Sequence, residues 1–208
     1  MLKNIYLPIE SAVLFILIPV LIALDIINLP LFSILWIGAA FALLMLHLDK
    51  SFDKKQLWNF KKTNFKAIGI RFFVSALFLT LITLLIEPNS FLQFVKSNTL
   101  FWAIIMIGYP LLSVYPQEII YRAFFTHRYS KFIKNKYFFI FLSALAFALA
   151  HIMFNNYIAI TLSFLGGLIF AYNYLKTKSL FSSSLEHALY GDFIFTIGIG
   201  RYFVASFM

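Results

Sequence analysis

The sequence predicts an all-α fold, a polytopic membrane bundle of about seven helices formed by the whole chain, 1–208, as a single membrane domain. Composition is the first observation: 62% of the residues are hydrophobic and only 12% are charged, too few polar residues to cover a soluble domain of this size. The second is that the apolar residues form long runs without the alternation typical of membrane β-strands. The third is that almost all lysines and arginines lie between these runs.

Each predicted span is an apolar run long enough to cross about 30 Å of hydrocarbon. In chain order, the seven spans are residues 8–26, 31–48, 67–86, 101–122, 137–154, 157–175 and 181–200. Pro110 lies inside the fourth span, where it predicts a kink. Residues 49–66 form a basic cytoplasmic linker between the second and third spans. This count also leaves room for an eighth, half-length or interfacial helix.

The distribution of basic residues predicts the orientation. With a cytoplasmic N terminus, fourteen of the 17 lysines and arginines fall on the inner side, including those of the 49–66 linker. The formal net charge of +9 is then explained by topology and by anionic lipid, so we expect the bilayer as a partner and no nucleic acid. The chain has no cysteine, which excludes disulfides and thiolate metal sites.

Ionisable residues inside the spans are the candidates for a functional site, because charge in hydrocarbon is costly unless it is paired or hydrated. Glu118 and Arg122 are four residues apart in the fourth span, so they can pair on one helical face beside Gln117. Phe147 precedes His151 by the same spacing in the fifth span. The remaining group, in the seventh span, consists of Glu186, His187 and Asp192.

Glu118, His151 and His187 are predicted to lie within one layer of the membrane and to converge on a cavity. Counted at about 1.5 Å per residue, they are roughly 20, 21 and 10 Å from the inner ends of their helices. One carboxylate and two imidazoles suit acid–base activation of water, in which the carboxylate or a histidine takes the proton. The same three side chains could hold a divalent metal such as zinc, and no cofactor is assigned from the sequence. The HExxH and GxSxG motifs of other hydrolases are absent from the sequence.

Three segments carry a resemblance to a known family: "QEIIYR" (117–122), "FALAH" (147–151) and "HALYG" (187–191). They resemble the motifs of the CAAX protease and bacteriocin-processing family, also called the abortive-infection family. Its pattern is two glutamates, three residues and an arginine; a phenylalanine, three residues and a histidine; and a histidine, three residues and an asparagine or aspartate. The resemblance covers roughly residues 100–200 and implies a catalytic core there. It implies an intramembrane endopeptidase of the bacterial inner (cytoplasmic) membrane, acting on a membrane-tethered protein or peptide.

The resemblance also implies roles for individual positions. Residues 117 and 151 would activate water, residues 187 and 191 would support the oxyanion, and Glu118 and Arg122 would form the adjoining pair. In this family the bacterial members are implicated in peptide processing and bacteriocin self-immunity, and others remove the C-terminal tripeptide of prenylated proteins.

The sequence departs from the family pattern at two positions. Gln117 replaces the first glutamate, and an amide cannot act as a general base. Gly191 replaces the asparagine or aspartate, and Asp192, about 100° further around the helix, could substitute only with local unwinding. We therefore expect Glu118 to be the working base, His151 to orient the water and His187 to stabilise the oxyanion. The supporting residues are Gln117, Arg122, Phe147, Gly191 and Asp192.

Two other interpretations remain open on the sequence alone. The departures at Gln117 and Gly191 favour a family member that no longer cleaves and acts as an immunity factor or membrane scaffold. A small transporter or lipid-binding protein would also use ionisable groups in the membrane, but the chain has no inverted repeat to support it.

Overall fold

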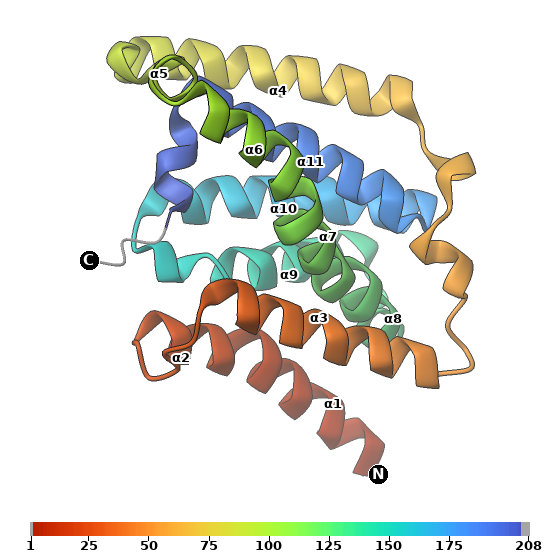
Figure 1. Cartoon of the computed structure of the whole chain (residues 1–208). Helices are drawn as coiled ribbons and strands as arrows, with labels where there is room; N and C mark the ends of the chain where they lie inside the picture. The colour runs from red at the N-terminus through yellow and green to blue at the C-terminus, as the bar shows by residue number, and fades with distance from the viewer. Residues whose placement is uncertain (1, 205–208) are drawn as a thin grey trace.

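The computed structural model describes residues 2–204, and over that range the chain folds into helices and connecting turns, without strands (Figure 1). The first hydrophobic stretch consists of α1 (Leu2–Ala12), a π-helical segment (Val13–Leu17) and α2 (Ile18–Ala23). It is followed by α3 (Leu31–Leu48), α4 (Phe65–Ile86) and the short α5 (Gln93–Ser97). The later helices are α6 (Thr99–Tyr109), α7 (Tyr115–Glu118), α8 (Phe125–Tyr129), α9 (Lys136–Leu149), α10 (Tyr157–Thr177) and α11 (Leu180–Ile197).

The predicted helical membrane bundle is confirmed, with six helical stretches in the described residues that are long and apolar enough to cross a membrane. These are Tyr6–Ala23, Leu31–Leu48, Phe65–Ile86, Thr99–Phe132, Lys136–Phe154 and Tyr157–Thr177. The seventh predicted span is also a helix, α11, but it does not reach the apolarity of the other six. The reason is its inward polar face, which includes the buried residues Ser182, Ser183, Glu186 and His187.

Helix α11 can carry polar residues because other helices surround it. It contacts α4, α6, α7 and α10, and Figure 1 shows it flanked by these elements near the centre of the bundle. A polar helix at membrane depth is tolerated where protein rather than lipid covers it. The outer helices show the opposite pattern: Leu85, Ile86 and Leu100 are 82%, 73% and 77% exposed, as expected of side chains that face lipid.

The fourth span changes its helical winding twice. At Pro110, where a kink was predicted, α6 gives way to a π-helical segment (Pro110–Val114), and a second one (Ile119–Phe124) follows α7. Such π-segments are often found at functional sites, because each shifts the register of the side chains around the helix axis. Glu118 lies between the two.

Helices α9 and α10 approach each other closely at Gly167. A Cβ atom on Gly167 would lie 2.9 Å from the Cα atom of Ala144. Any larger residue at this position would push the two backbones apart. The contact fixes α9, which carries Phe147 and ends just before His151, against α10.

The 49–66 linker is held against one end of the bundle. It contains two short 3₁₀ turns, Lys54–Leu57 and Phe60–Lys62. The Ser179 hydroxyl donates to the Asn59 carbonyl (2.7 Å), and the Tyr174 hydroxyl donates to the Gln56 side chain (3.1 Å). The linker therefore lies where α10 ends and α11 begins, at the opposite end of α4 from Glu87.

Candidate active site

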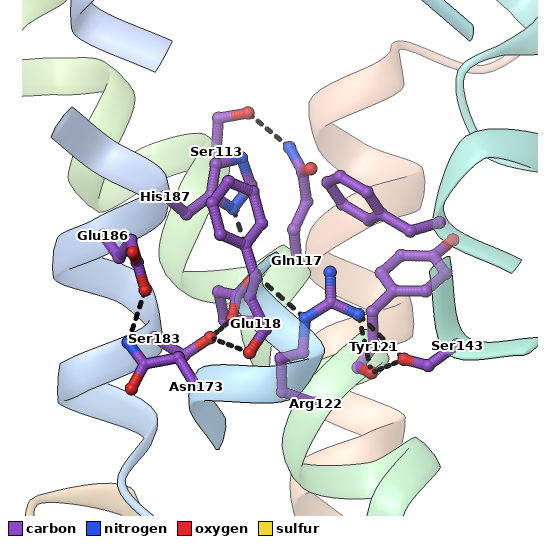
Figure 2. Close-up of polar contacts among 12 residues, drawn as sticks. Ser113, Gln117, Glu118, Tyr121, Arg122, Ser143, Asn173, Ser183, Glu186 and His187 are labelled. Atoms are coloured by element: carbon purple, nitrogen blue, oxygen red, sulfur yellow. Dashed lines mark hydrogen bonds and ion pairs between the residues drawn. The ribbon is translucent and has the colours of Figure 1, made fainter. Parts of the chain in front are cut away.

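Glu118 is the centre of a buried polar cluster and is fully shielded from solvent. One of its carboxylate oxygens is 3.1 Å from Nδ1 of His187 and 3.4 Å from Nε of Arg122. The other accepts a short hydrogen bond from the Ser183 hydroxyl. Figure 2 shows the carboxylate between His187 on α11 and Arg122 on its own helix. Both oxygens are thus already engaged by protein groups.

The ion pair predicted between Glu118 and Arg122 is present, and Arg122 is itself fully buried. One terminal nitrogen of its guanidinium donates to the Ser143 hydroxyl (2.9 Å) and to the Tyr121 carbonyl (3.2 Å). The guanidinium carbon also lies 4.9 Å from the centre of the Phe147 ring, a cation–π distance. These contacts hold the positive charge beside Glu118 and join α9 to the fourth span.

His187 has a hydrogen-bond partner on each ring nitrogen. Glu118 lies at Nδ1, and the Tyr109 hydroxyl lies 3.2 Å from Nε2. Because a carboxylate only accepts hydrogen bonds, we assign the proton to Nδ1 and a lone pair to Nε2. Phe170 stacks on the imidazole with ring centres 4.5 Å apart and planes at 16°, which fixes its orientation.

His151 follows α9, one helical turn after Phe147, as the spacing predicted. Its Nδ1 donates to the Phe147 carbonyl at 2.7 Å, and the two rings are in edge contact at 4.7 Å. A carbonyl cannot donate, so Nδ1 carries the proton here too and Nε2 is free to accept one. Only 9% of the surface of His151 is exposed.

Both histidines line one cavity of about 440 Å³. Tyr109, Phe147 and Gly191 lie next to them in its wall, while the rest of the wall is mostly apolar and comes from α4, α10 and the segment after α11. The predicted convergence on a cavity thus holds for His151 and His187. Among the described lining residues Glu118 is absent, because it lies behind His187 and contacts that imidazole rather than the cavity.

The two departures from the family pattern have different surroundings. The Gln117 amide donates to the Ser113 hydroxyl at 2.7 Å, and Figure 2 shows this side chain directed toward Ser113. Its carbonyl oxygen is buried, with no hydrogen-bond partner among residues 2–204. Helix α11 runs unbroken through Gly191 and Asp192, so the unwinding that would bring Asp192 onto the face of His187 does not occur.

The suggested metal ligands do not gather. Over the described part of the chain, no group of three histidine, aspartate or glutamate side chains lies close enough to hold a metal ion. Glu118 and His187 are adjacent, but His151 does not join them, and the Arg122 charge beside Glu118 disfavours a cation there. We therefore derive no step through a metal.

Sequence reasoning missed three residues of this region. Tyr109 contacts His187, and Ser183 contacts Glu118. Arg71 binds Glu186 through two parallel hydrogen bonds of 2.7 and 2.9 Å. Ser183 had a usable signal, since it precedes His187 by four residues on the same helical face. The other two contacts join different helices, and nothing in the local sequence indicates them.

The fold and its apolar surface define an integral membrane protein whose polar site lies inside the bundle. Residues 96–191 match the family described as "Type II CAAX prenyl endopeptidase Rce1-like". The match confirms the family resemblance that the three motifs indicated, over a segment that contains Glu118, His151 and His187. No curated protein and no solved structure matches the chain. Over residues 96–191 the chain is therefore similar to membrane-embedded proteases of the CAAX type.

Proposed function

We propose that this protein is an intramembrane endopeptidase that hydrolyses a peptide bond of a membrane-tethered protein or peptide. One observation carries the proposal: His151 and His187 line the same cavity, each with its proton held on Nδ1, and Nε2 of His151 is left as an acceptor while Nε2 of His187 accepts from Tyr109. Imidazoles with a fixed tautomer are suited to moving protons at neutral pH. The family match over residues 96–191 supports the same reaction class.

We assign the base role to His151 rather than to Glu118. Nε2 of His151 takes a proton from a water molecule, and the hydroxide oxygen bonds to the carbonyl carbon of the substrate. The C–N bond then breaks, and the leaving nitrogen takes the proton back from His151. Glu118 acts as a positioning residue, because its oxygens already accept from His187 and Ser183 and pair with Arg122.

The position of the cavity suggests how a substrate reaches it. Its wall extends along α4 to Glu87 and along the final 3₁₀ turn (Ile199–Phe203) to Tyr202, at the opposite end of the bundle from the 49–66 linker. If the basic linker is cytoplasmic, as the positive-inside rule suggests, the cavity extends from the level of His187 to the outer end of the bundle. We therefore propose that the substrate enters from the outer half of the bilayer. The catalytic core proposed for residues 100–200 then shares its cavity wall with α4.

The alternative is a protein of this family that binds a hydrophobic peptide without cleaving it. Gln117, an amide where the family has a carboxylate, favours this function because its side chain is tied to Ser113 and cannot act as a base. An immunity factor or membrane scaffold would still need the cavity. It would not need the histidine tautomers.

Comparative terminal proteomics on host membranes separates the two functions. We would compare wild type, a deletion, His151→Gln and His187→Gln, each checked for expression and folding. His127→Gln is the matched control, because His127 pairs with Asp49 away from the cavity. We expect a cleaved terminus that is present with wild type and His127→Gln and absent from the other three. If both site variants retain that terminus, the protease function is wrong and the binding function replaces it.

A further inference from the structure

Tyr109 fills the space of the side chain that Gly191 lacks. A Cβ atom added to Gly191 would lie 2.1 Å from Cε1 of Tyr109 and 2.5 Å from its hydroxyl oxygen. These distances are far below van der Waals contact, so any residue other than glycine at position 191 requires the tyrosine ring to move. The ring and a side chain at position 191 are therefore mutually exclusive.

The Tyr109 hydroxyl that fills this space is hydrogen-bonded to His187. Tyr109 is the last residue of α6, just before Pro110, and its hydroxyl lies 3.2 Å from Nε2 of His187. Since Nε2 has a lone pair when Nδ1–H points to Glu118, the phenol donates this hydrogen bond. An edge contact with Phe195, at 5.4 Å between ring centres, helps to fix the ring.

The bonds form a chain from the cavity wall to the buried charge. Tyr109 donates to His187, which donates to Glu118, and Glu118 pairs with Arg122. Position 191 is four residues after His187, so a polar side chain there would lie one turn beyond the imidazole on the same face. The tyrosine reaches this place from a different helix.

We propose that Tyr109 is the oxyanion donor of this site and that it replaces the asparagine or aspartate missing at Gly191. The inference rests on the proposed hydrolysis. A neutral His187 with its proton on Nδ1 has no hydrogen at Nε2 to offer to a developing oxyanion. The hydroxyl of Tyr109, which is a residue of the cavity wall, has one. It turns its O–H from Nε2 to the carbonyl oxygen as negative charge develops there, and no proton is transferred.

Kinetics of four variants would test whether Tyr109 takes the place of a side chain at position 191. The substrate is a synthetic peptide that spans the terminus identified by proteomics, and the full-length protein is assayed in lipid nanodiscs. We expect Tyr109→Phe to lower kcat by roughly 100- to 1,000-fold with little change in KM, the range seen when one oxyanion donor is removed. Gly191→Asn should lose as much, because the new side chain displaces the ring. Tyr109→Ala combined with Gly191→Asn should recover at least about tenfold over Tyr109→Ala alone.

Tyr172→Phe is the control, because Tyr172 lies on α10 outside the cavity and its ring stays in place to pack against Lys136 and Lys176. A Tyr109→Phe protein with wild-type kcat would overturn the proposed role of Tyr109 and leave the protease function intact. A wild-type protein that produces no terminus would overturn both.

A spectroscopic measurement separates a direct contact from a general loss of packing. The chain has four histidines, so the ¹⁵N resonances of histidine-labelled protein can be assigned by single substitutions. In Tyr109→Phe we expect the Nε2 resonance of His187 to move downfield, because the nitrogen loses its donor, while that of His151 stays unchanged. An unmoved His187 resonance would show that the hydroxyl does not bind Nε2, and the proposal would fail.

Discussion

Two buried carboxylates, Glu186 and Glu118, each pair with an arginine inside the bundle, and the two pairs are built differently. Glu186 and Arg71 form two parallel bonds of 2.7 and 2.9 Å, and Asn173 adds a third bond to the carboxylate at 2.7 Å. Glu118 and Arg122 are 3.4 Å apart, and the carboxylate gives its closer contacts to His187 and Ser183. The first pair is saturated by its own partners. In the second pair, the carboxylate also accepts a hydrogen bond from the His187 imidazole.

The difference shows how one motif type can serve structure or function in the same protein. A bidentate pair locks two helices together and has no capacity left for chemistry. A looser pair neutralises the carboxylate charge in the membrane while a histidine uses the carboxylate to fix its tautomer. Burial alone cannot tell the two apart, because Glu118 and Glu186 are both fully buried.

The largest effect is expected from Glu118→Gln. The amide can donate to Nδ1 of His187 and so favours the wrong tautomer, which in a comparable triad costs on the order of 10⁴-fold in rate. Arg122 also loses its counter-charge in the bundle, which costs about 3–5 kcal/mol when one partner of a buried pair is removed. Cleavage kinetics and unfolding in mixed micelles would measure both. A stable, fully active variant would show that Glu118 does not position His187.

Glu186→Gln should separate stability from activity. The variant loses the bidentate bond to Arg71, whose side chain is 28% exposed and can be rehydrated, so we expect a loss of about 1–3 kcal/mol. The rate per folded molecule should stay close to that of wild type, because His187 keeps all its partners. If Glu186→Gln is folded but as inactive as Glu118→Gln, the distinction between the two pairs is wrong.

The sequence could predict the contacts that form between residues close together in the chain. The Glu118–Arg122 pair and the Phe147–His151 contact both follow from a spacing of four residues, and both are present. The helical bundle followed from composition and from runs of apolar residues. The six apolar spans are those that face lipid, where hydrophobicity reports position directly.

The missing information concerns how the helices are rotated against one another. Tyr109 meets His187, and Arg71 meets Glu186, across 78 and 115 residues of sequence, so no local pattern links them. For the same reason, residue type suggested Glu118 as the base, whereas its helix turns it toward His187 and away from the cavity. The polar residues of α11 were recognised from the sequence, but the sequence cannot show which neighbouring helices cover them.

Ser183→Ala tests the contact that distinguishes Glu118 from Glu186, and its expected effects on rate and stability are smaller than those of Glu118→Gln. The hydroxyl donates to the buried carboxylate, and a hydrogen bond to a charged group contributes about 1.5–3 kcal/mol. We expect a stability loss in that range and a rate loss smaller than that of Glu118→Gln. Ser184→Ala is the matched control, since the Ser184 hydroxyl is buried without a hydrogen-bond partner among the described residues. Equal losses in the two variants would assign the effect to packing.

The smallest effect is expected from a third carboxylate contact, outside the hydrocarbon, between Asp49 and His127. The His127 ring and the Ser51 hydroxyl and amide hold the pKa of Asp49 below its usual value of 3.8. A lowered pKa means that the ionised form stabilises the fold at any pH above 3.8, and that this contribution is lost as the pH falls from there toward the lower, folded-state pKa. Unfolding midpoints measured from pH 6 downward should therefore fall more steeply below about pH 3.8 for wild type than for Asp49→Asn. Parallel curves would mean that the pair contributes nothing, as is common for exposed pairs in water. A carboxylate contact would then contribute to stability at Glu118 and Glu186, where protein surrounds it, and not at Asp49, where water does.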